Sequence, residues 1–389
     1  MRLLELLAYA TLVYWLATLA AALGGLRRIP ALPPARELRR DPPLVSVIIA
    51  AKEEEAAIAD TVRSLLQQDY PRFEIIAVND RSADATGRRL DELKRWTERL
   101  PSARVPLRVV HVTSLPEGWL GKNHALYQGY KQAKGSYLLF TDADISFRPN
   151  TIRDAVAYME SADADHLTLA PLMTAKSFWL RAFVHYFMFS LLLYLRLWRA
   201  NDDRQHRFGT GIGAFNLVTR KAYEAIGTHR AIAMRPDDDL QLGQLIKRAR
   251  FKQRIAVGKR HLEVEWYPSL RAAVHGLEKN LFSGFGYRLS SAIAGMIGQL
   301  IAFFGPFAGL LLLPRPSGIA SAASAGILIG LYVSATRRLS RDTGIDACAL
   351  PAAVWMLVAV LARSVALTIR RGGVYWRGTF YPLERLRRK

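Results

Sequence analysis

Two patterns of hydrophobic and polar positions occur along this chain. Long, nearly uncharged stretches lie at both ends, and a central region switches between short apolar runs and amphipathic segments. Residues 6–26 form the first apolar stretch, which at about 20 residues is long enough to span a bilayer. Further apolar stretches follow at 293–313, 319–333 and 347–369. The pattern predicts a folded domain carried between membrane segments.

The central region, from residue 44 to about residue 266, predicts alternating strands and helices. Continuous apolar and β-branched runs such as LVSVIIA indicate buried strands, and segments with helical spacing separate them. The predicted strands are residues 44–50, 73–78, 107–112, 136–141 and 214–218. The predicted helices are residues 54–68, 85–100 and 122–133, followed by an amphipathic run from residue 240. Such alternation is typical of an α/β fold with a mostly parallel sheet covered by helices.

One segment of this region, residues 178–198, is nearly as apolar as a membrane span. Its polar side chains Arg181, His185, Arg196 and Arg199 fall within about 60° of one another on a helix. A narrow basic stripe on an aromatic-rich helix predicts an amphipathic helix that lies in the membrane interface. A buried core helix is the alternative, and a full span is disfavoured because it would divide the domain.

Charge and cysteine content narrow the classes of protein. Of 389 residues, 54 are Lys or Arg and 33 are Asp or Glu, which gives a net charge of +21. The basic residues cluster beside the apolar stretches, at 27–40, 337–341 and 370–389, so they indicate anionic headgroups rather than nucleic acid. The single cysteine, Cys348, excludes a disulfide framework and a cysteine zinc site.

These observations predict an order of domains. We expect a transmembrane helix at 1–26, a linker at 27–43, a cytoplasmic domain at 44–286, membrane segments at 287–369 and a basic tail at 370–389. The arginines after the first segment place the central domain in the cytoplasm. Three further spans would leave the basic tail outside. One C-terminal segment is therefore expected to be re-entrant or interfacial, and Pro306 makes the first of them the candidate.

Polar clusters follow three of the predicted strands, where ligands bind in an open α/β sheet. They are residues 51–55, 79–82 and 142–144. In the last cluster, the carboxylates of Asp142 and Asp144 can share a hard divalent cation that also binds phosphate oxygens. A capped turn before Pro149 is the alternative explanation.

A second acidic cluster, Asp237–Asp239, precedes an amphipathic helix. Acidic residues stabilise a helix N-terminus, but three together exceed that need, and their repulsion would raise at least one pKa toward the range of a general base. Other site classes lack their motifs. The first strand is not followed by G-x-G-x-x-G, no paired histidines indicate a zinc hydrolase, and no G-x-S-x-G is present. The glycine-rich run 209–213 leads into a strand, so it lets backbone approach a ligand.

Four ordered motifs resemble those of family 2 glycosyltransferases with the GT-A fold. They are Val45–Ala51 followed by Lys52-Glu53-Glu54, the run 79–86 (NDRSADAT), the run 141–144 (TDAD) and the run 238–242 (DDLQL). The resemblance covers about residues 44–258. The run 118–125 (GWLGKNHA) and the flanking apolar segments look closest to the membrane-bound hopanoid-associated and carotenoid-type glycosyltransferases. The resemblance implies a Rossmann-like nucleotide-sugar domain with transmembrane helices at both ends.

The resemblance also implies roles for individual residues. Asp80 would contact the base or ribose of a UDP- or GDP-sugar, with Lys52 and Glu54 beside the same pocket. Lys122 and Asp142 would also bind the nucleotide sugar. Asp142 and Asp144 would hold Mn²⁺ or Mg²⁺ on the donor diphosphate.

The catalytic base would be Asp239, at the position of the aspartate in the family's E-D pair. Two positions depart from the family pattern. Ala50 stands where a proline is usual, and Asp238 replaces the usual glutamate, so Asp238 is the alternative base.

The activity that the resemblance implies is inverting, metal-dependent transfer of one sugar to a membrane lipid. The Q/R-x-x-R-W motif of processive synthases has no match after Asp239, which favours a single transfer. We expect a multi-pass protein of a prokaryotic cytoplasmic membrane, with its catalytic domain in the cytoplasm. A polyprenyl-phosphate sugar transferase and a non-catalytic membrane scaffold of the same fold are the alternatives.

Overall fold

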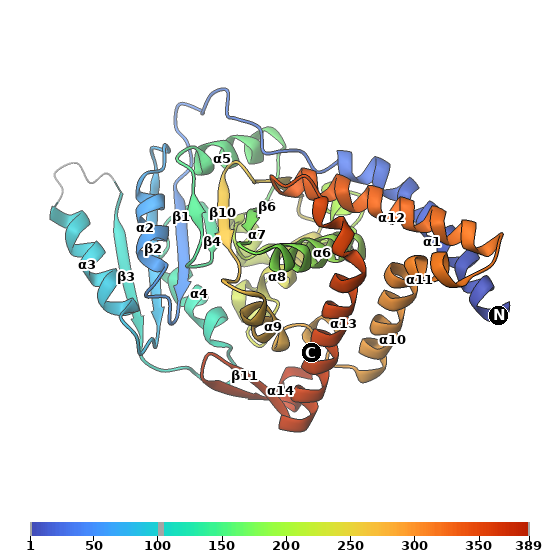
Figure 1. Ribbon diagram of the computed structural model, residues 1–389. Helices are drawn as coiled ribbons and strands as arrows, with labels where there is room; N and C mark the ends of the chain where they lie inside the picture. The colour runs from blue at the N-terminus through green and yellow to red at the C-terminus, as the bar shows by residue number, and fades with distance from the viewer. Residues whose placement is uncertain (1, 100–104, 388–389) are drawn as a thin grey trace. The chain divides into compact units, whose positions relative to one another are not determined.

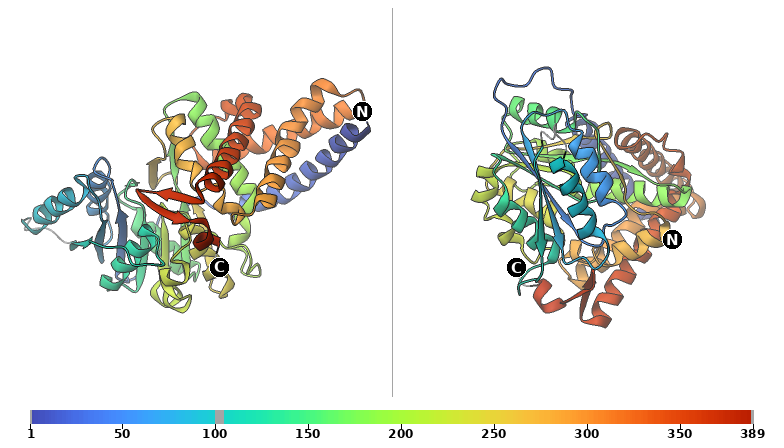
Figure 2. Two further views of the ribbon diagram at one scale, coloured as in Figure 1. Left: turned by 90° about the horizontal axis from the view of Figure 1, so that it is seen from below. Right: turned by 90° about the vertical axis from the view of Figure 1, so that its left-hand side faces the viewer.

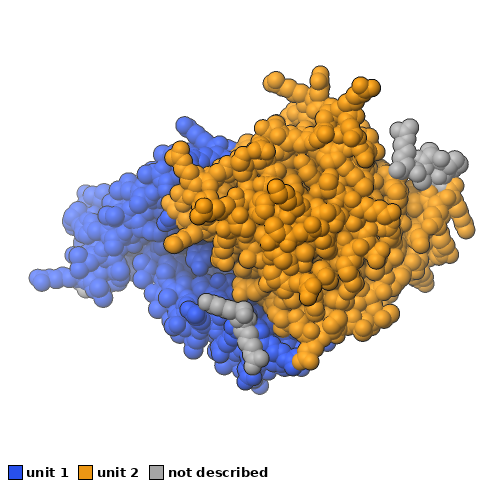
Figure 3. All heavy atoms as spheres, turned by 180° about the vertical axis from the view of Figure 1, so that it is seen from behind, with its two compact units in different colours: residues 1–28, 173–196, 265–389 blue, residues 29–172, 197–264 orange. Residues whose placement is uncertain are grey.

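The computed structural model describes residues 2–99 and 105–387 of the chain (Figure 1). Residue 100 of one predicted helix and the last two residues of the predicted basic tail lie outside the described residues. The chain divides into two compact units, shown in separate colours in Figure 3. The α/β unit, which is unit 2 in Figure 3, comprises residues 29–172 and 197–264. The apolar unit, which is unit 1 in Figure 3, comprises residues 1–28, 173–196 and 265–389.

The α/β unit is built on a mixed, mostly parallel sheet of seven strands in the order β3-β2-β1-β4-β8-β6-β9. The strands are β1 Val45–Ala51, β2 Phe73–Asp80, β3 Leu107–Val112, β4 Tyr137–Thr141, β6 His166–Ala170, β8 Asn216–Thr219 and β9 Gln253–Val257. Strand β8 runs antiparallel to both of its neighbours, and the other pairs in the sheet are parallel. A short antiparallel pair, β5 Ser146–Phe147 and β10 Leu262–Glu265, lies outside this sheet.

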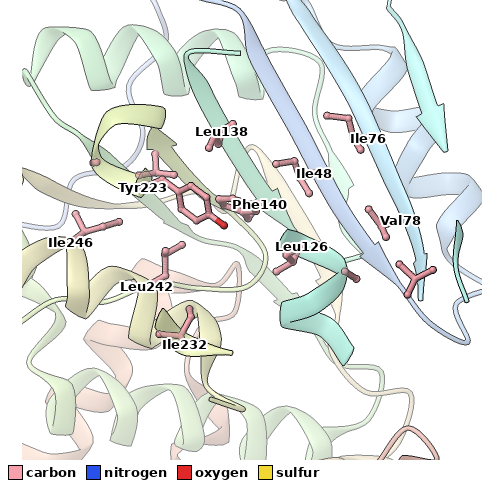
Figure 4. Close-up of a cluster of buried hydrophobic side chains, with 14 residues drawn as sticks. Ile48, Ile76, Val78, Leu126, Leu138, Phe140, Tyr223, Ile232, Leu242 and Ile246 are labelled. Carbon is pink, nitrogen blue, oxygen red and sulfur yellow. The ribbon is translucent and has the colours of Figure 1, made fainter. Parts of the chain in front are cut away.

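Helices cover this sheet and bury an apolar core (Figure 4). They are α2 Ile58–Leu66, α3 Thr86–Arg99, α4 Gly121–Gln132, α5 Thr151–Ser161, α7 Arg220–Ala225 and α8 Asp238–Arg248, with short 3₁₀ turns at Leu197–Asn201 and Thr228–Ile232. The core cluster joins Ile48 and Ile76 of the sheet to Leu126 of α4 and Leu242 of α8. Because its strands are covered on both faces, β1 is apolar at consecutive positions rather than at alternate ones.

The segment after the first apolar helix is attached to the edge of this sheet. Ala31 forms a parallel bridge with Val257 of β9, the outermost strand. The Leu32 N–H donates to the Val257 carbonyl at 3.0 Å, and the Ala35 N–H donates to the buried carboxylate of Asp154 at 2.9 Å. Part of the predicted linker is therefore fixed to the sheet.

The apolar unit consists mainly of helices. They are α1 Arg2–Arg27, α6 Phe178–Leu195, α9 Leu270–Glu278, α10 Leu289–Gln299, α11 Gly305–Leu312, α12 Ser317–Leu339 and α13 Leu350–Arg371, followed by the hairpin β11 Gly373–Trp376 and β12 Thr379–Pro382 and by α14 Leu383–Arg387. Strand β7 Leu172–Thr174 lies where the units join in sequence. Helix α1 packs beside α12 in the views of Figures 1 and 2.

Five helical segments among the described residues are long and apolar enough to cross a membrane. They are Arg2–Arg27, Phe178–Leu195, Leu289–Leu312, Ser317–Leu339 and Ile345–Arg371. In the third, a π-helical turn at Leu300–Phe304 precedes Pro306, and the helix continues through α11. The α/β fold with apolar helices toward both ends is thus confirmed, whereas the orientation of each helix in a bilayer remains a prediction.

The basic stripe of α6 faces acidic side chains of its own unit. The His185 ring lies 2.9 Å from Asp346 through Nδ1 and 3.4 Å from Asp342 through Nε2. Arg181 lies 3.9 Å from Asp342. The Tyr332 hydroxyl also donates to Asp346, which is buried. These contacts give two members of the stripe partners within the protein.

Candidate functional site

The loops that follow β1 and β2 are joined by reciprocal hydrogen bonds. The Glu53 N–H donates to the Ser82 hydroxyl at 3.1 Å, and the Glu53 carboxylate accepts from the Ala83 N–H at 2.8 Å. The Glu54 N–H donates to the Thr86 hydroxyl at 2.8 Å. Helix α2 begins at residue 58, later than residue 54, where the sequence predicts it. Lys52 and Glu54 lie on this loop, at the edge of the sheet that carries Asp80.

Asp80 is the last residue of β2 and is 2% exposed. Its two carboxylate oxygens accept from the guanidinium of Arg81, with Nε–Oδ1 at 2.7 Å and Nη2–Oδ2 at 3.0 Å. A Cβ at Gly121, the first residue of α4, would lie 2.4 Å from Asp80 Oδ2. The start of α4 therefore packs directly against this pair, and a larger residue at 121 would displace it.

The D-x-D pair follows β4, with β1 between it and β2. The Asp142 N–H donates to the Gly213 carbonyl at 3.1 Å, and the Ala143 carbonyl accepts from the Thr61 hydroxyl at 2.8 Å, so the turn is held from two sides. The side chain of Asp144 reaches solvent. The surrounding protein removes part of the hydration of the Asp144 carboxylate, and the negative charges of Asp142 and Glu54 lie nearby. Both effects raise the pKa of Asp144, to about 7.

Lys122 joins the D-x-D pair to the second acidic cluster. Its Nζ lies 2.8 Å from Asp142 Oδ1 and 3.4 Å from Asp238 Oδ1. Burial opposes the charge on this ammonium, but the carboxylates of Asp142, Asp238 and Asp239 outweigh burial and raise the pKa of Lys122. Residues that are far apart in the sequence thus form one charged group at the sheet edge.

Asp238 and Asp239 begin helix α8 and have different environments. Asp238 is 4% exposed and faces Lys122. Burial raises the pKa of Asp238 to about 7, with the Lys122 charge opposing the shift and Asp239 adding to it. Asp239 accepts the N–H of Gly213 at 2.7 Å and that of Leu240 at 2.8 Å. Burial also raises the pKa of Asp239, although these hydrogen bonds favour its charged form.

The glycine-rich run at 209–213 brings the two acidic clusters together. Gly213 binds the backbone of Asp142 and the carboxylate of Asp239, and a Cβ on Gly213 would lie 2.4 Å from Asp142 Oδ2. A Cβ on Gly211 would lie 2.0 Å from the Asp239 carbonyl. The glycines therefore let the backbone pack closely against both acidic clusters. The sequence had predicted only that they let the backbone approach a ligand.

Asn123 supports the loop beside this site, and the sequence named it only as part of the run 118–125. It is fully buried, and its side-chain N–H₂ donates to the carbonyls of Ile232 at 2.8 Å, Ala233 at 3.1 Å and Arg235 at 2.9 Å. These carbonyls belong to the loop that leads into α8 and its acidic residues. Asn123 thus fixes this loop beside Lys122. Its signal in the sequence was its place after Lys122 in the run 118–125.

Sequence comparison relates the domain that carries these residues to a known family. The sequence model described as "Glycosyl transferase family 2" matches residues 46–227, which include the ends of β1, β2 and β4. This is a family 2 glycosyltransferase domain. The predicted family and enzyme class are therefore confirmed.

Curated relatives of this glycosyltransferase are similar over nearly its whole length. Two proteins of Staphylococcus aureus are both named 4,4'-diaponeurosporenoate glycosyltransferase. The one from strain bovine RF122 / ET3-1 is 24% identical over 355 residues, covering 88% of this chain and 89% of its own. The one from strain MRSA252 is 23% identical over 365 residues, covering 90% and 92%. The carotenoid-type resemblance expected from the sequence is confirmed at this low identity.

A solved structure supports the fold. The mannosyltransferase PcManGT from Pyrobaculum calidifontis, in complex with GDP-Man and Mn²⁺, matches with a TM-score of 0.50 and 17% identity. The match covers 94% of this chain and 98% of the mannosyltransferase. The GT-A fold predicted for the central domain is confirmed by this likeness.

The carboxylates of the site are compatible with a divalent metal. Across residues 2–99 and 105–387, no group of three or more His, Cys, Asp or Glu side chains is arranged to hold a metal ion by itself. Mg²⁺-type sites commonly use one or two carboxylates, with substrate phosphates and water as the remaining ligands. The crowded pair Asp142 and Asp144 supplies such oxygen ligands, and mutual repulsion between the carboxylates favours a cation beside them.

Proposed function

We propose that this glycosyltransferase moves one sugar from a UDP- or GDP-sugar to a membrane lipid, with metal dependence and inversion at the anomeric carbon. The observation that carries the proposal is the contact of Lys122 with both Asp142 and Asp238, at 2.8 and 3.4 Å. Through this contact, Lys122 links the pair Asp142 and Asp144, which is suited to bind a metal and a diphosphate, to the pair Asp238 and Asp239, which is suited to accept a proton. A non-catalytic scaffold would not require this charged group.

The proposed roles follow from the positions of the side chains. Asp142 and Asp144 would hold Mn²⁺ or Mg²⁺, whose charge neutralises the donor diphosphate. Lys122 adds a fixed positive charge beside them. Asp239, or Asp238 in its place, takes the proton of the acceptor hydroxyl as the hydroxyl oxygen attacks the anomeric carbon. The bond from that carbon to the nucleoside diphosphate breaks at the same time, and the configuration inverts.

A lipid acceptor is supported by the apolar unit and by the relatives. Five of its segments are apolar and long enough to cross a membrane, and a helix such as α1 exposes large apolar side chains, including Leu3, Leu6 and Val13. The relatives' name, 4,4'-diaponeurosporenoate glycosyltransferase, identifies their acceptor as an apolar carotenoid acid. We expect this chain likewise to act on an apolar acceptor. A polyprenyl phosphate is the second acceptor class, because it would use the same donor residues.

Calorimetry tests the donor part of this proposal. The purified full chain should bind UDP or GDP more tightly with Mn²⁺ than with EDTA, and Asp142→Ala should remove the difference. Asp60→Ala is the matched control, because Asp60 is an exposed carboxylate of the same unit. Unchanged affinity with and without EDTA in the parent chain would refute metal dependence. Mass spectrometry of lipids from cells with and without the gene then identifies the acceptor.

A further inference from the structure

The pair formed by Asp80 and Arg81 presents its arginine to solvent. The Asp80 side chain is 4% exposed and that of Arg81 is 21% exposed. Both carboxylate oxygens of Asp80 accept from the guanidinium. A bidentate pair of this kind fixes the plane of the guanidinium as well as its position. A molecule that reaches this edge from solvent therefore meets Arg81 before it meets the carboxylate.

The backbone holds Arg81 in an unusual conformation. Its φ angle is +54°, in the left-handed region that side chains other than glycine rarely adopt. The turn after it is closed by the Ser82 N–H, which donates to the Asn79 side-chain oxygen at 3.3 Å. On the other side, a Cβ at Gly121 would lie 2.7 Å from Arg81 Nη2. The strained residue is thus supported by its own turn and by the start of α4, as is typical of functional sites.

The sheet order determines which part of a nucleotide would reach Arg81. Strand β1 lies between β4, which ends at the D-x-D pair, and β2, which ends at Asp80. Neighbouring strands are about 4.8 Å apart, so the two sites are separated by roughly 10 Å along the sheet edge. On the other side of β4, the edge is taken up by Gly213, which binds both Asp142 and Asp239. The nucleoside of a diphosphate held at Asp142 and Asp144 would therefore extend past β1 toward the end of β2.

From these observations, we infer that Arg81 contacts the base of the nucleotide donor and that Asp80 positions it. The inference rests on the proposed function. The guanidinium has only donors, so it suits bases that present carbonyl oxygens, such as uracil or guanine, over adenine, which presents an amino group. Arg81 is then a specificity-determining residue, and Asp80 acts through it.

The test is the affinity of the full chain for four probes with Mn²⁺ present: UDP, GDP, ADP and inorganic pyrophosphate. Arg81→Gln should weaken binding of UDP or GDP by about 10- to 150-fold, the range for one lost hydrogen bond to a charged group. Binding of ADP should change less, and binding of pyrophosphate should not change. Asp80→Asn should weaken UDP or GDP binding less than Arg81→Gln does, because the asparagine oxygen still accepts from the arginine.

Arg63→Gln is the matched control, because Arg63 is an exposed arginine of the same unit that pairs with Asp60. Thermal unfolding of each variant checks that the domain remains folded. The inference is overturned if the parent chain binds UDP or GDP and Arg81→Gln binds it equally well, or loses pyrophosphate to the same extent. If Asp80→Asn loses more than Arg81→Gln, Asp80 itself is the contact. Failure of the parent chain to bind any nucleoside diphosphate would instead refute the proposed function.

Discussion

Gly213 lies between the two acidic clusters, and the space for a side chain there is already occupied. Its N–H donates to Asp239, its carbonyl accepts from Asp142, and a Cβ would lie 2.4 Å from Asp142 Oδ2. The Asp142 carboxylate is the end of a movable side chain, so a methyl group at residue 213 would displace it rather than unfold the domain. We therefore expect the activity of the site to be sensitive to one added methyl group at residue 213.

Gly213→Ala is therefore expected to lower kcat strongly with little loss of stability. A displacement of about 1 Å can reduce turnover on the order of 10²-fold. The measurement is steady-state sugar transfer, with thermal unfolding of the same samples. Gly326→Ala is the control, because no atom lies within 4 Å of a Cβ built there. Full activity in Gly213→Ala would show that the position of Asp142 is not critical.

The two aspartates at the start of α8 make the assignment of the base testable. Asp239→Asn should lower turnover on the order of 10²–10⁴-fold while donor binding stays nearly intact, because a general base acts on the acceptor. Asp238→Asn should also alter the contact with Lys122, so we expect it to change donor binding. Single-turnover kinetics and calorimetry separate these effects. Full activity in Asp239→Asn with a loss in Asp238→Asn would move the base to residue 238.

At the scale of secondary-structure elements, β6, β8 and β9 are tied together by a buried histidine. His166 lies 3.1 Å from Asn216 Oδ1 through Nε2 and 2.7 Å from Gln253 Nε2 through Nδ1. The amide of Gln253 donates to Nδ1, which fits the neutral ring with its proton on Nε2. Burial lowers the pKa of His166 from 6.5 to about 4. Three strands are thus joined through a ring that is neutral at physiological pH.

This histidine predicts loss of stability in acid. Below pH 6.5, His166 is protonated in the unfolded chain, whereas in the folded chain it stays neutral until the pH falls to about 4. The stability contributed by the neutral ring is therefore complete above about pH 6.5 and is lost as the pH falls toward 4, by up to about 3 kcal/mol. Thermal unfolding of the full chain between pH 4 and 8 measures it. In His166→Asn, the unfolding temperature should fall less between pH 6.5 and pH 4 than it does in the parent chain. Substitution of the exposed His206 should leave this pH dependence unchanged.

Much of the fold of the α/β unit could be predicted from local patterns. Strand β1 was predicted at 44–50 and lies at Val45–Ala51, because buried parallel strands carry continuous apolar runs. Helix α2 was predicted to begin at residue 54 and begins at Ile58. The N–H groups of residues 53–55 instead bind side chains of residues 82–86, which follow β2. Hydrogen bonds of this kind join distant segments and leave no periodic signal.

The site was predicted as separate clusters, and their assembly was not. The motifs placed Asp142 and Asp238 at the ends of different elements, but the contact of Lys122 with both of them depends on how α4 and α8 pack. Asn123 was missed for the same reason, since its three partners are backbone carbonyls more than a hundred residues away. The roles of these residues in transfer remain predictions.

At the scale of the whole molecule, the apolar unit should decide which acceptor is used. Helix α6 is largely packed within this unit, where Phe183 is fully buried and Phe187 stacks against Trp266 at 5.0 Å. Substitution of Phe183 would therefore test folding rather than acceptor binding. Trp179 and Tyr194 of the same helix are 51% and 70% exposed, so they are available to lipid.

We expect the double variant Trp179→Ser with Tyr194→Ser to lose transfer to a lipid acceptor and to keep transfer to a soluble mimic of its head. Exposed aromatic side chains on a membrane helix favour the interface, where an acceptor lipid presents its hydroxyl. Transfer to both acceptors is measured on the full chain in nanodiscs. Trp96→Ser is the control, since Trp96 is 50% exposed on α3 of the other unit. Equal loss with both acceptors would show that α6 supports the fold and does not select the lipid, because a contact specific to lipid cannot slow transfer to a soluble molecule.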